Sequence, residues 1–328
     1  IMRHTAFWLT ANDSIELYVN HWSTAQPPIA IVMIAHGMAE HSQRYARFAV
    51  ELAEQGIAVF ALDQRGHGHT ATLGTLGYFA DEDGWNLVVN DLCCLNHHIR
   101  VQFPNTPIFL FGHSMGSYIA LNYLMQHSCS LQGAILSGSN YFKTSARYRL
   151  AMAVARFERW RIGAKGRSRL LETLIFYPYR RAIKARRSTW DWLSRDTEQV
   201  QAYIDDPLCG FICTTQMWLD VLLGLQRITP VRNMVQIEND LPLLIVGGDA
   251  DPINHGRRLI DLANALRQAG NRSVDIKLYP EARHEVLQEL NHAEVTADII
   301  QWLNTALAYK RDFNIPQLVS GELHDTKH

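Results

Sequence analysis

The chain has 328 residues, and 47% of them are hydrophobic. This composition is ordinary for a protein that buries a sizeable core, and the length suits one large domain or one domain with an insertion. The formal net charge of −1 gives no global attraction for nucleic acid. No apolar run approaches the roughly 20 residues needed to cross a bilayer, and residues 1–14 lack the basic and apolar regions of a secretion signal. We therefore expect a cytoplasmic protein that does not bind nucleic acid.

The five cysteines are Cys93, Cys94, Cys129, Cys209 and Cys213. Their odd number and the absence of paired C-x-x-C spacing predict reduced thiols. Cys209 and Cys213 are four residues apart and could share a helix face as metal ligands, but no nearby histidine pair completes a tetrahedral set. We interpret them as small packing residues.

Strand-like and helix-like segments alternate through the first half of the chain. Short apolar, branched runs predict strands, and apolar residues at helical spacing predict helices. In chain order we expect a strand over 29–35, a helix over 44–55, a strand over 57–62, a helix over 85–103, a strand over 108–111, a helix over 114–127 and a strand over 133–137. This alternation predicts an α/β fold with a mostly parallel sheet covered on both faces. Active sites in such sheets lie at the carboxyl ends of the strands.

The alternation stops after about residue 141 and resumes with a strand over 241–246. A helix over 257–268, a strand over 274–278 and a helix over 293–309 follow. The stretch between the two halves reads mostly as helices. We therefore expect a core formed by residues 1–141 and 241–310, a helical lid inserted over 142–240 and a polar tail over 311–328.

A serine lies between two glycines directly after the strand predicted over 108–111. The sequence there is Gly112-His113-Ser114-Met115-Gly116. A sharp strand-to-helix turn that projects a nucleophilic serine crowds the positions two before and two after it, so glycines at both positions are typical of a nucleophile elbow. A bland turn before a helix could carry the same pattern, so the motif needs catalytic partners elsewhere in the chain.

A serine nucleophile requires a histidine base and an acid that orients it, and this kind of fold orders them serine, acid, histidine along the chain. Asp251 follows the strand predicted over 241–246, and His284 follows the next strand. We predict Asp251 as the acid and His284 as the base. Asp249 is the rival acid, although an aspartate beside glycine often only forms a turn. The rival bases His255 and His292 do not directly follow a strand.

Acyl transfer also needs hydrogen-bond donors for the oxyanion of the tetrahedral intermediate. One should be the backbone N–H of Met115, which follows the nucleophile at the start of a helix. The second should come from the loop after the strand over 29–35, and we predict the N–H of Met38.

Several runs, taken in order, resemble the monoacylglycerol lipase and lysophospholipase branch of the α/β-hydrolases. They are HGMAEHSQRY over 36–45, DQRGHG over 63–68 and GHSMG over 112–116, with a similar spacing of Asp251 and His284. The stretch DPLCGF over 206–211 resembles bacterial members. The resemblance covers about residues 10–310. It implies an α/β-hydrolase fold and hydrolysis of a fatty-acyl ester without cofactor or metal.

By position, the resemblance carries over Ser114 as nucleophile, Asp251 and His284 as its partners, and the amides of Met38 and Met115 as oxyanion donors. The chain departs from the family at Met38, where a small residue is common, and at Ser117, where another glycine is usual. The larger Met38 side chain could narrow the channel for the acyl group.

The predicted lid is strongly basic. Between residues 143 and 195, fifteen lysines and arginines stand against three acidic residues, and aromatic residues are interleaved with them. Such a surface is typical of an interfacial segment. We hypothesise that the lid docks peripherally on anionic phospholipid surfaces or steers a phosphate-bearing lysolipid. The alternative is a solvated basic surface paired with acidic residues elsewhere, such as Asp81, Glu82 and Asp83.

Three function classes follow. We favour a serine ester hydrolase that cleaves monoacylglycerols or lysophospholipids through an acyl-enzyme intermediate. A serine peptidase of the aminopeptidase type shares the fold and triad, but it would need an acidic patch to hold a substrate amine. A non-catalytic hydrolase fold used for binding is the third, and it is disfavoured because every catalytic position is filled.

Overall fold

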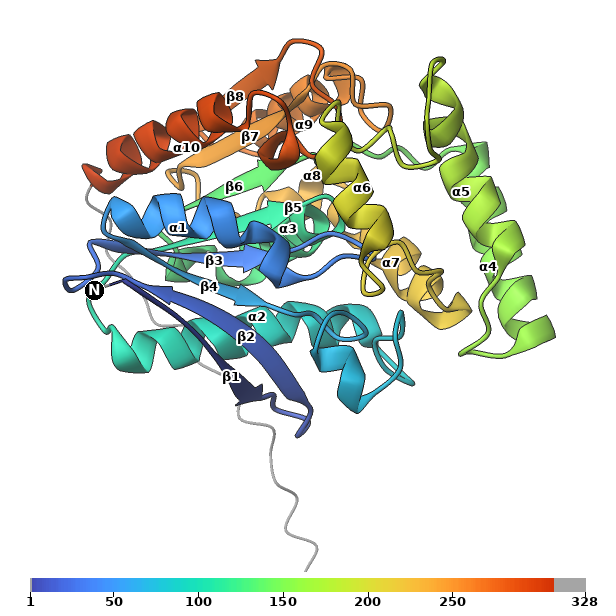
Figure 1. Ribbon diagram of the computed structural model, residues 1–328, viewed down its shortest axis with the longest axis horizontal. Coiled ribbons are helices and arrows are strands. Elements are labelled where there is room, and N and C mark those ends of the chain that lie inside the picture. The colour runs from blue at the N-terminus through green and yellow to red at the C-terminus, as the bar shows by residue number, and fades with distance from the viewer. Residues whose placement is uncertain (1, 310–328) are drawn as a thin grey trace, which may run out of the picture.

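The computed structural model describes residues 2–309, and it is built around one eight-stranded sheet (Figure 1). The strands are β1 (Arg3–Thr10), β2 (Glu16–Ser23), β3 (Ala30–Ala35), β4 (Ile57–Leu62), β5 (Ile108–His113), β6 (Gly133–Ser137), β7 (Leu243–Gly248) and β8 (Val274–Tyr279). Their order across the sheet is β1-β2-β4-β3-β5-β6-β7-β8. Strands β3 to β8 are parallel, while β1 and β2 pair antiparallel at one edge. The predicted α/β fold with a mostly parallel sheet is confirmed.

The helices alternate with the strands in the two halves of the chain. They are α1 (Ala46–Glu54), α2 (Gly84–Gln102), α3 (Met115–His127), α4 (Ala146–Ile162), α5 (Arg169–Ala182), α6 (Thr197–Asp205), α7 (Thr215–Ile228), α8 (Val231–Met234), α9 (Arg257–Gln268) and α10 (His292–Leu307). Short 3-10 turns lie at Ser42–Tyr45, Thr70–Leu73, Ser128–Ser130 and Val286–Gln288. None of the helices in residues 2–309 combines the length and the apolar character needed to span a bilayer.

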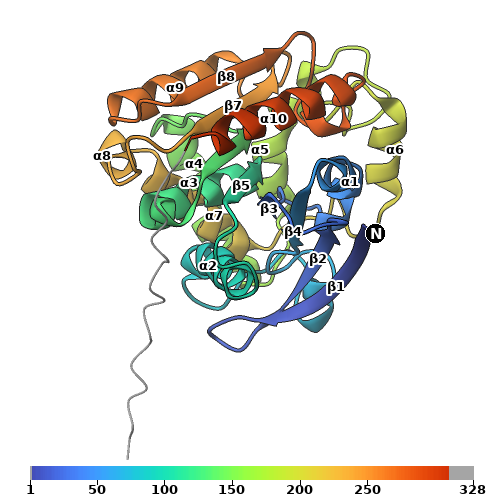
Figure 2. The same ribbon diagram turned by 90° about the vertical axis from the view of Figure 1, so that its left-hand side faces the viewer.

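The central strands are apolar along their whole length because both faces of the sheet are covered. Ile31 and Met33 of β3 pack into the larger core with α2, α3 and α9, whereas Val32 and Ile34 pack into a second core with α1 and α10. Figure 2 shows α1 and α10 on one side of the sheet and α2 and α3 on the other. This two-sided packing fixes the parallel strands whose carboxyl ends carry the site.

The hairpin of β1 and β2 lies outside the predicted elements. Most side chains of β1 are exposed, so the strand has no continuous apolar run that would have revealed it. Strand β7 begins two residues later than predicted, at Leu243, directly after Pro242, which lacks the N–H that a ladder requires.

All five helices between β6 and β7 fall within the predicted lid, and Figure 1 shows α4, α5 and α6 gathered at one end of the sheet. Helix α7 differs from them because it packs deeply on the core. A Cβ added at Gly224 would lie 2.1 Å from the Trp85 ring of α2. The division into core and lid over 142–240 stays a prediction, and the predicted tail over 311–328 lies outside the described residues. The five cysteines are free thiols, as predicted.

Candidate active site

Ser114 lies in the sharp turn between β5 and α3. Its φ of 51° is rare for a residue with a side chain, and its N–H donates to the Ser137 carbonyl at 2.9 Å, which holds the turn. A Cβ at Gly112 would lie 2.4 Å from the Gly116 carbonyl oxygen, and one at Gly116 would lie 2.0 Å from the Ala35 carbonyl oxygen. The two glycines therefore permit the turn for the steric reason that the sequence suggested.

The loop after β8 brings His284 to this serine. Nε2 of His284 lies 2.9 Å from Oγ of Ser114, and Nδ1 lies 2.8 Å from Oδ2 of Asp251. Asp251, in the loop after β7, is fully buried and also accepts hydrogen bonds from the N–H of Ile253 and the side-chain amide of Asn254. Because Nδ1 donates to Asp251, Nε2 is left to accept a proton from the serine hydroxyl.

The structure separates the predicted residues from their rivals. Asp249 is exposed, and its carboxylate accepts the N–H of Glu281 at 2.7 Å, so it braces one loop against the next. His255 is exposed, and His292 begins α10; among the described residues neither ring is hydrogen-bonded to Ser114. Of the candidate acids and bases, only Asp251 and His284 share a hydrogen-bonded chain with the serine.

The loop after β3 leaves one backbone amide beside the cavity without a protein acceptor. The Gly37 N–H donates to Oε1 of Glu40 at 2.5 Å, and the Ala39 N–H donates to Nε2 of His67 at 3.1 Å. Burial lowers the pKa of His67 to about 3, so its ring is neutral and can accept this bond. Within residues 2–309, the Met38 N–H between them has no protein acceptor.

The Met115 N–H at the start of α3 likewise has no protein acceptor in the described part of the chain. First-turn amides of a helix lack intrahelical partners and suit negative charge. Met38, Met115 and Ser114 all line the same cavity. This arrangement supports the two predicted amides as donors to one oxyanion.

A buried ion network that the sequence analysis missed joins this loop to the histidine loop. Arg44 donates to both carboxylate oxygens of Glu285 at 2.8 Å and to Glu40 at 2.5 Å, and Glu40 also binds the Gly37 N–H. Glu285 directly follows His284. The spacing of four residues between Glu40 and Arg44 could have suggested their ion pair from the sequence. Nothing in the sequence connects Arg44 with Glu285, which lies 241 positions away.

The charges around His284 favour its protonated form. Burial alone would lower the pKa of His284, but the Asp251 carboxylate, assisted by Glu285 and Glu40, outweighs burial and raises it. The ring of His113 lies 4.9 Å away, and burial together with His284 lowers the pKa of His113 to about 4. Of these two adjacent imidazoles, His284 is therefore the one that accepts a proton near neutral pH.

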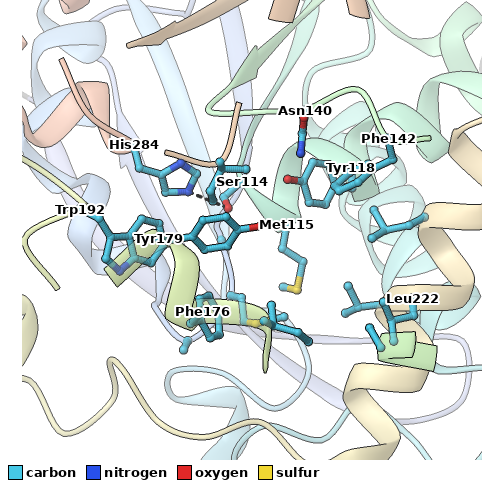
Figure 3. Close-up of a pocket in the computed structure, with 18 of the residues that line it drawn as sticks. Ser114, Met115, Tyr118, Asn140, Phe142, Phe176, Tyr179, Trp192, Leu222 and His284 are labelled. Carbon is cyan, nitrogen blue, oxygen red and sulfur yellow. Dashed lines mark hydrogen bonds between the residues drawn. The ribbon is translucent and has the colours of Figure 1, made fainter. Parts of the chain in front are cut away.

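A cavity of about 420 Å³ opens over Ser114 (Figure 3). Its wall is mainly aromatic and aliphatic, contributed by α3, α5, α7 and the loops beside them. The labelled apolar members are Met115, Tyr118, Phe142, Phe176, Tyr179, Trp192 and Leu222. The Trp192 ring lies 5.2 Å from the His284 ring, and its carbonyl accepts the His284 N–H at 3.4 Å. The helical insertion therefore contacts the histidine directly.

One group of side chains in residues 2–309 could in principle hold a metal ion. His41, Asp206 and Cys209 place three potential ligand atoms within 4.8 Å of one another. Nε2 of His41 lies 2.6 Å from the Asp206 carboxylate, and burial raises the pKa of the Cys209 thiol well above its usual range. A protonated thiol is a poor ligand, so we interpret this group as a contact between the loop after β3 and the helical insertion.

The sequence matches the family model described as "Serine aminopeptidase, S33" over residues 26–291. A monoacylglycerol lipase of Mycolicibacterium smegmatis is 27% identical over 292 residues, which cover 88% of this chain and 93% of that protein. The human monoglyceride lipase is 27% identical over 297 residues, covering 89% and 86%.

Among solved structures, a thermostable carboxyl esterase from Bacillus coagulans in complex with glycerol matches with a TM-score of 0.84 and 27% identity. The match covers 93% of this chain and 99% of that one. The family model covers well over half of the sequence, and the fold agrees with it. The chain therefore belongs to the serine aminopeptidase family and has the α/β-hydrolase fold.

Proposed function

We propose that this protein is a serine hydrolase that cleaves fatty-acyl esters of glycerol, with Ser114, His284 and Asp251 as its catalytic triad. His284 takes the proton of the Ser114 hydroxyl while the serine oxygen attacks the ester carbonyl. The amides of Met38 and Met115 stabilise the oxyanion that forms, and each lowers the activation barrier by about 3 kcal/mol. His284 then protonates the leaving alcohol as its C–O bond breaks, which leaves the acyl group on Ser114. A water that gives its proton to the same ring attacks this acyl-enzyme, and the fatty acid is released as His284 returns the proton to the serine oxygen.

The hydrogen-bonded chain from Asp251 through His284 to Ser114, with distances of 2.8 and 2.9 Å, is the observation that carries the proposal. The monoacylglycerol and monoglyceride lipases among the relatives support glycerol esters as substrates. The apolar cavity suits an acyl chain because burial of its methylene groups is favourable.

The charge of the cavity wall argues against an aminopeptidase. Glu40 and Glu285 each pair with Arg44, and Glu172 pairs with Arg180 at 2.6 Å, so these carboxylates are already engaged. The remaining acidic side chain of the wall, Asp261, lies one helical turn from Arg257 and Arg258, which line the same cavity, so it is not an isolated negative charge. An enzyme that binds a substrate amine needs an unpaired acidic group at that place. A purely binding role is disfavoured because the three catalytic side chains lie in hydrogen-bonded order.

Turnover across monoacylglycerols, lysophospholipids, short esters and aminoacyl amides tests the proposal, with the Ser114→Ala protein as the control. We expect turnover of glycerol monoesters by the wild type only. Equal rates for both proteins on every substrate would contradict the mechanism. Preference for the amides would favour the peptidase.

We further propose that α4 and α5 contact anionic lipid surfaces. Their outer lid surface carries the exposed side chains Leu150, Phe157, Trp160, Leu170 and Tyr177, interleaved with Arg149, Arg156, Arg169 and Arg181. Phe157 and Trp160 are neighbours on α4, with ring centroids 5.8 Å apart, and Trp160 is 79% exposed. In the described part of the chain no ion pair joins Asp81, Glu82 or Asp83 to a lid cation.

Each cation near an anionic leaflet contributes about 1 kcal/mol to the free energy of membrane binding. The exposed aromatic rings of α4 and α5 can enter the interface between lipid and water. Sedimentation with liposomes at low and high salt tests this contact. We expect binding to anionic vesicles that weakens as salt rises. Equal sedimentation with neutral and anionic vesicles at low salt would contradict it.

A further inference from the structure

Asn140 is a buried polar side chain at the active site that makes no hydrogen bond within the described residues. It follows β6, lines the cavity over Ser114 and is 3% exposed. Its Oδ1 is fully buried without a partner, and its amide nitrogen has none either but remains accessible. A carboxamide can form several hydrogen bonds, and leaving one unpaired in the interior is costly. Such a group calls for a ligand.

The backbone that carries Asn140 is held in place. Gly138 has a φ of 53°, which favours glycine, and its N–H donates to the Val246 carbonyl at 3.0 Å. The carbonyl of Ser139 accepts the side-chain amide of Asn254 at 3.0 Å, and the same amide binds Asp251. The loop of Asn140 is thus tied to the loop of Asp251, so the carboxamide has a fixed place relative to the proposed triad.

A second polar group without a partner lines the same cavity. In the view of Figure 3, Asn140 lies above the ring of Tyr118, and its amide nitrogen is directed toward the Tyr118 side chain. Tyr118 lines the same cavity, and its hydroxyl has no hydrogen-bond partner among residues 2–309. Burial raises the pKa of Tyr118 well above its usual range, so the phenol stays protonated and can donate.

The cavity wall carries both polar and apolar side chains. Polar side chains come from the loop after β6, with Asn140 and Lys143, and from the start of α9, with Arg257 and Asp261. Because β6 and β7 are neighbours in the sheet and α9 follows β7, these groups lie over adjacent strand ends. Apolar side chains come mainly from α5 and α7. An ester has two ends, and these two kinds of side chain suit an apolar acyl chain and a hydroxylated alcohol.

We propose that Asn140, assisted by the Tyr118 hydroxyl, binds a free hydroxyl of the substrate's glycerol and thereby sets the selectivity for glycerol esters. The amide nitrogen is the accessible end of the carboxamide, so the substrate hydroxyl accepts a hydrogen bond from the Asn140 N–H and remains free to donate one elsewhere. The proposal rests on the ester hydrolysis proposed above, and it assigns the recognition of the alcohol to residues outside the triad.

The test compares two soluble substrates with the same acyl group, 1-butyrylglycerol and ethyl butyrate, which differ in the hydroxyls of the alcohol. We expect Asn140→Leu to lower the ratio of kcat/KM for the glycerol ester over the ethyl ester about tenfold, because one buried hydrogen bond is lost. Tyr118→Phe should lower the ratio about threefold by the same reasoning. The matched control Asn304→Leu, on the exposed side of α10, should leave the ratio unchanged.

A ratio that stays within about twofold of the wild type in Asn140→Leu would overturn the inference while leaving the ester hydrolase intact. Should the variant fold poorly, Asn140→Ser serves in its place. If the wild type cleaved neither ester, the proposed function would fail, and glycerol binding would still test the residue. Saturation-transfer NMR should detect glycerol bound to the Ser114→Ala protein. An equally strong signal from the double variant Ser114→Ala, Asn140→Leu would overturn the inference.

Discussion

Charged side chains are arranged differently in two regions of the molecule. One is the side of the sheet formed by the carboxyl ends of the parallel strands, which carries Ser114 and is called the sheet edge below, and the other is the outer lid surface of α4 and α5. At the sheet edge the buried charged groups have partners within hydrogen-bond distance, as Arg44 has with Glu40 and Glu285 and as Asp251 has with His284. On the outer lid surface, Arg149, Arg156 and Arg169 are exposed, and no ion pair involves them in residues 2–309. The first arrangement fixes geometry, and the second leaves charge available to something outside the molecule.

The difference teaches where substitutions should matter for chemistry. Buried paired charges are costly to break because one partner is left without solvent or counter-charge. Exposed charges contribute little to folding but can attract an anionic surface over about a Debye length. Changes at the sheet edge should therefore alter kcat or stability, whereas changes on the outer lid surface should alter association with lipid.

The largest expected effect separates two neighbouring aspartates at the sheet edge. Asp251→Asn should reduce kcat on the order of 10⁴-fold, because the amide cannot hold His284 in the productive tautomer. Asp249→Asn is the matched control and should change kcat by less than about threefold, since its carboxylate is exposed and accepts only the Glu281 N–H. Steady-state kinetics on a short ester would decide, and loss of turnover in the Asp249 variant alone would contradict the assignment.

The next effect compares an ion pair from each region. Arg44→Met leaves Glu40 and Glu285 buried without their cation, so we expect a loss of about 3–5 kcal/mol in the free energy of unfolding. Arg161→Met removes an exposed arginine from the buried carboxylate of Glu158 on α4, which keeps the hydrogen bond from Ser168, so it should cost less than a change that leaves two buried carboxylates without their cation. Chemical denaturation measures both variants, and similar losses in the two would break the comparison.

The pH dependence should report the same buried charges. His284 acts as a base only when neutral, and because the Asp251 carboxylate raises its pKa, kcat/KM should fall on acidification with a midpoint above the ordinary value of 6.5. Glu285 also raises this pKa, so Glu285→Gln should move the midpoint to lower pH. A pH profile of kcat/KM on a soluble ester checks both, and a midpoint unmoved by the variant would argue against the electrostatic role of Glu285.

The smallest effect on chemistry should come from the outer lid surface. Replacing Phe157 and Trp160 with alanine removes two exposed rings, so turnover of a soluble short ester should stay within about twofold. Binding to anionic liposomes should fall, because the interfacial anchors are lost. Co-sedimentation run beside the ester assay gives both readouts. Unchanged binding with impaired ester turnover would reverse the roles given to the two regions.

The sequence predicted the elements whose signals are local. The apolar runs of β3 to β7, the alternating pattern of β8 and the glycines around Ser114 follow from burial and sterics over a few residues, and the structure agrees with them. The exposed hairpin of β1 and β2 carries no such run and was missed. The order of Ser114, Asp251 and His284 could be anticipated because the fold fixes where strand ends meet.

Other parts of the site depend on contacts between distant segments, which no local pattern reveals. Arg44 meets Glu285 across 241 positions, and the isolation of Asn140 can be recognised only when its surroundings are known. The packing of α7 on the core likewise depends on Trp85, far from it in sequence. These features arise from tertiary structure, so they had to be read from the fold.

The account depends most on Ser114 being a nucleophile activated by His284. Labelling with a fluorophosphonate probe, followed by mass mapping of the labelled peptide, tests this directly. We predict one adduct on Ser114, lost in Ser114→Ala, strongly slowed in His284→Ala and reduced by competing monoacylglycerol. A folded wild-type protein that takes up no probe, or takes it up on another residue, would contradict the account.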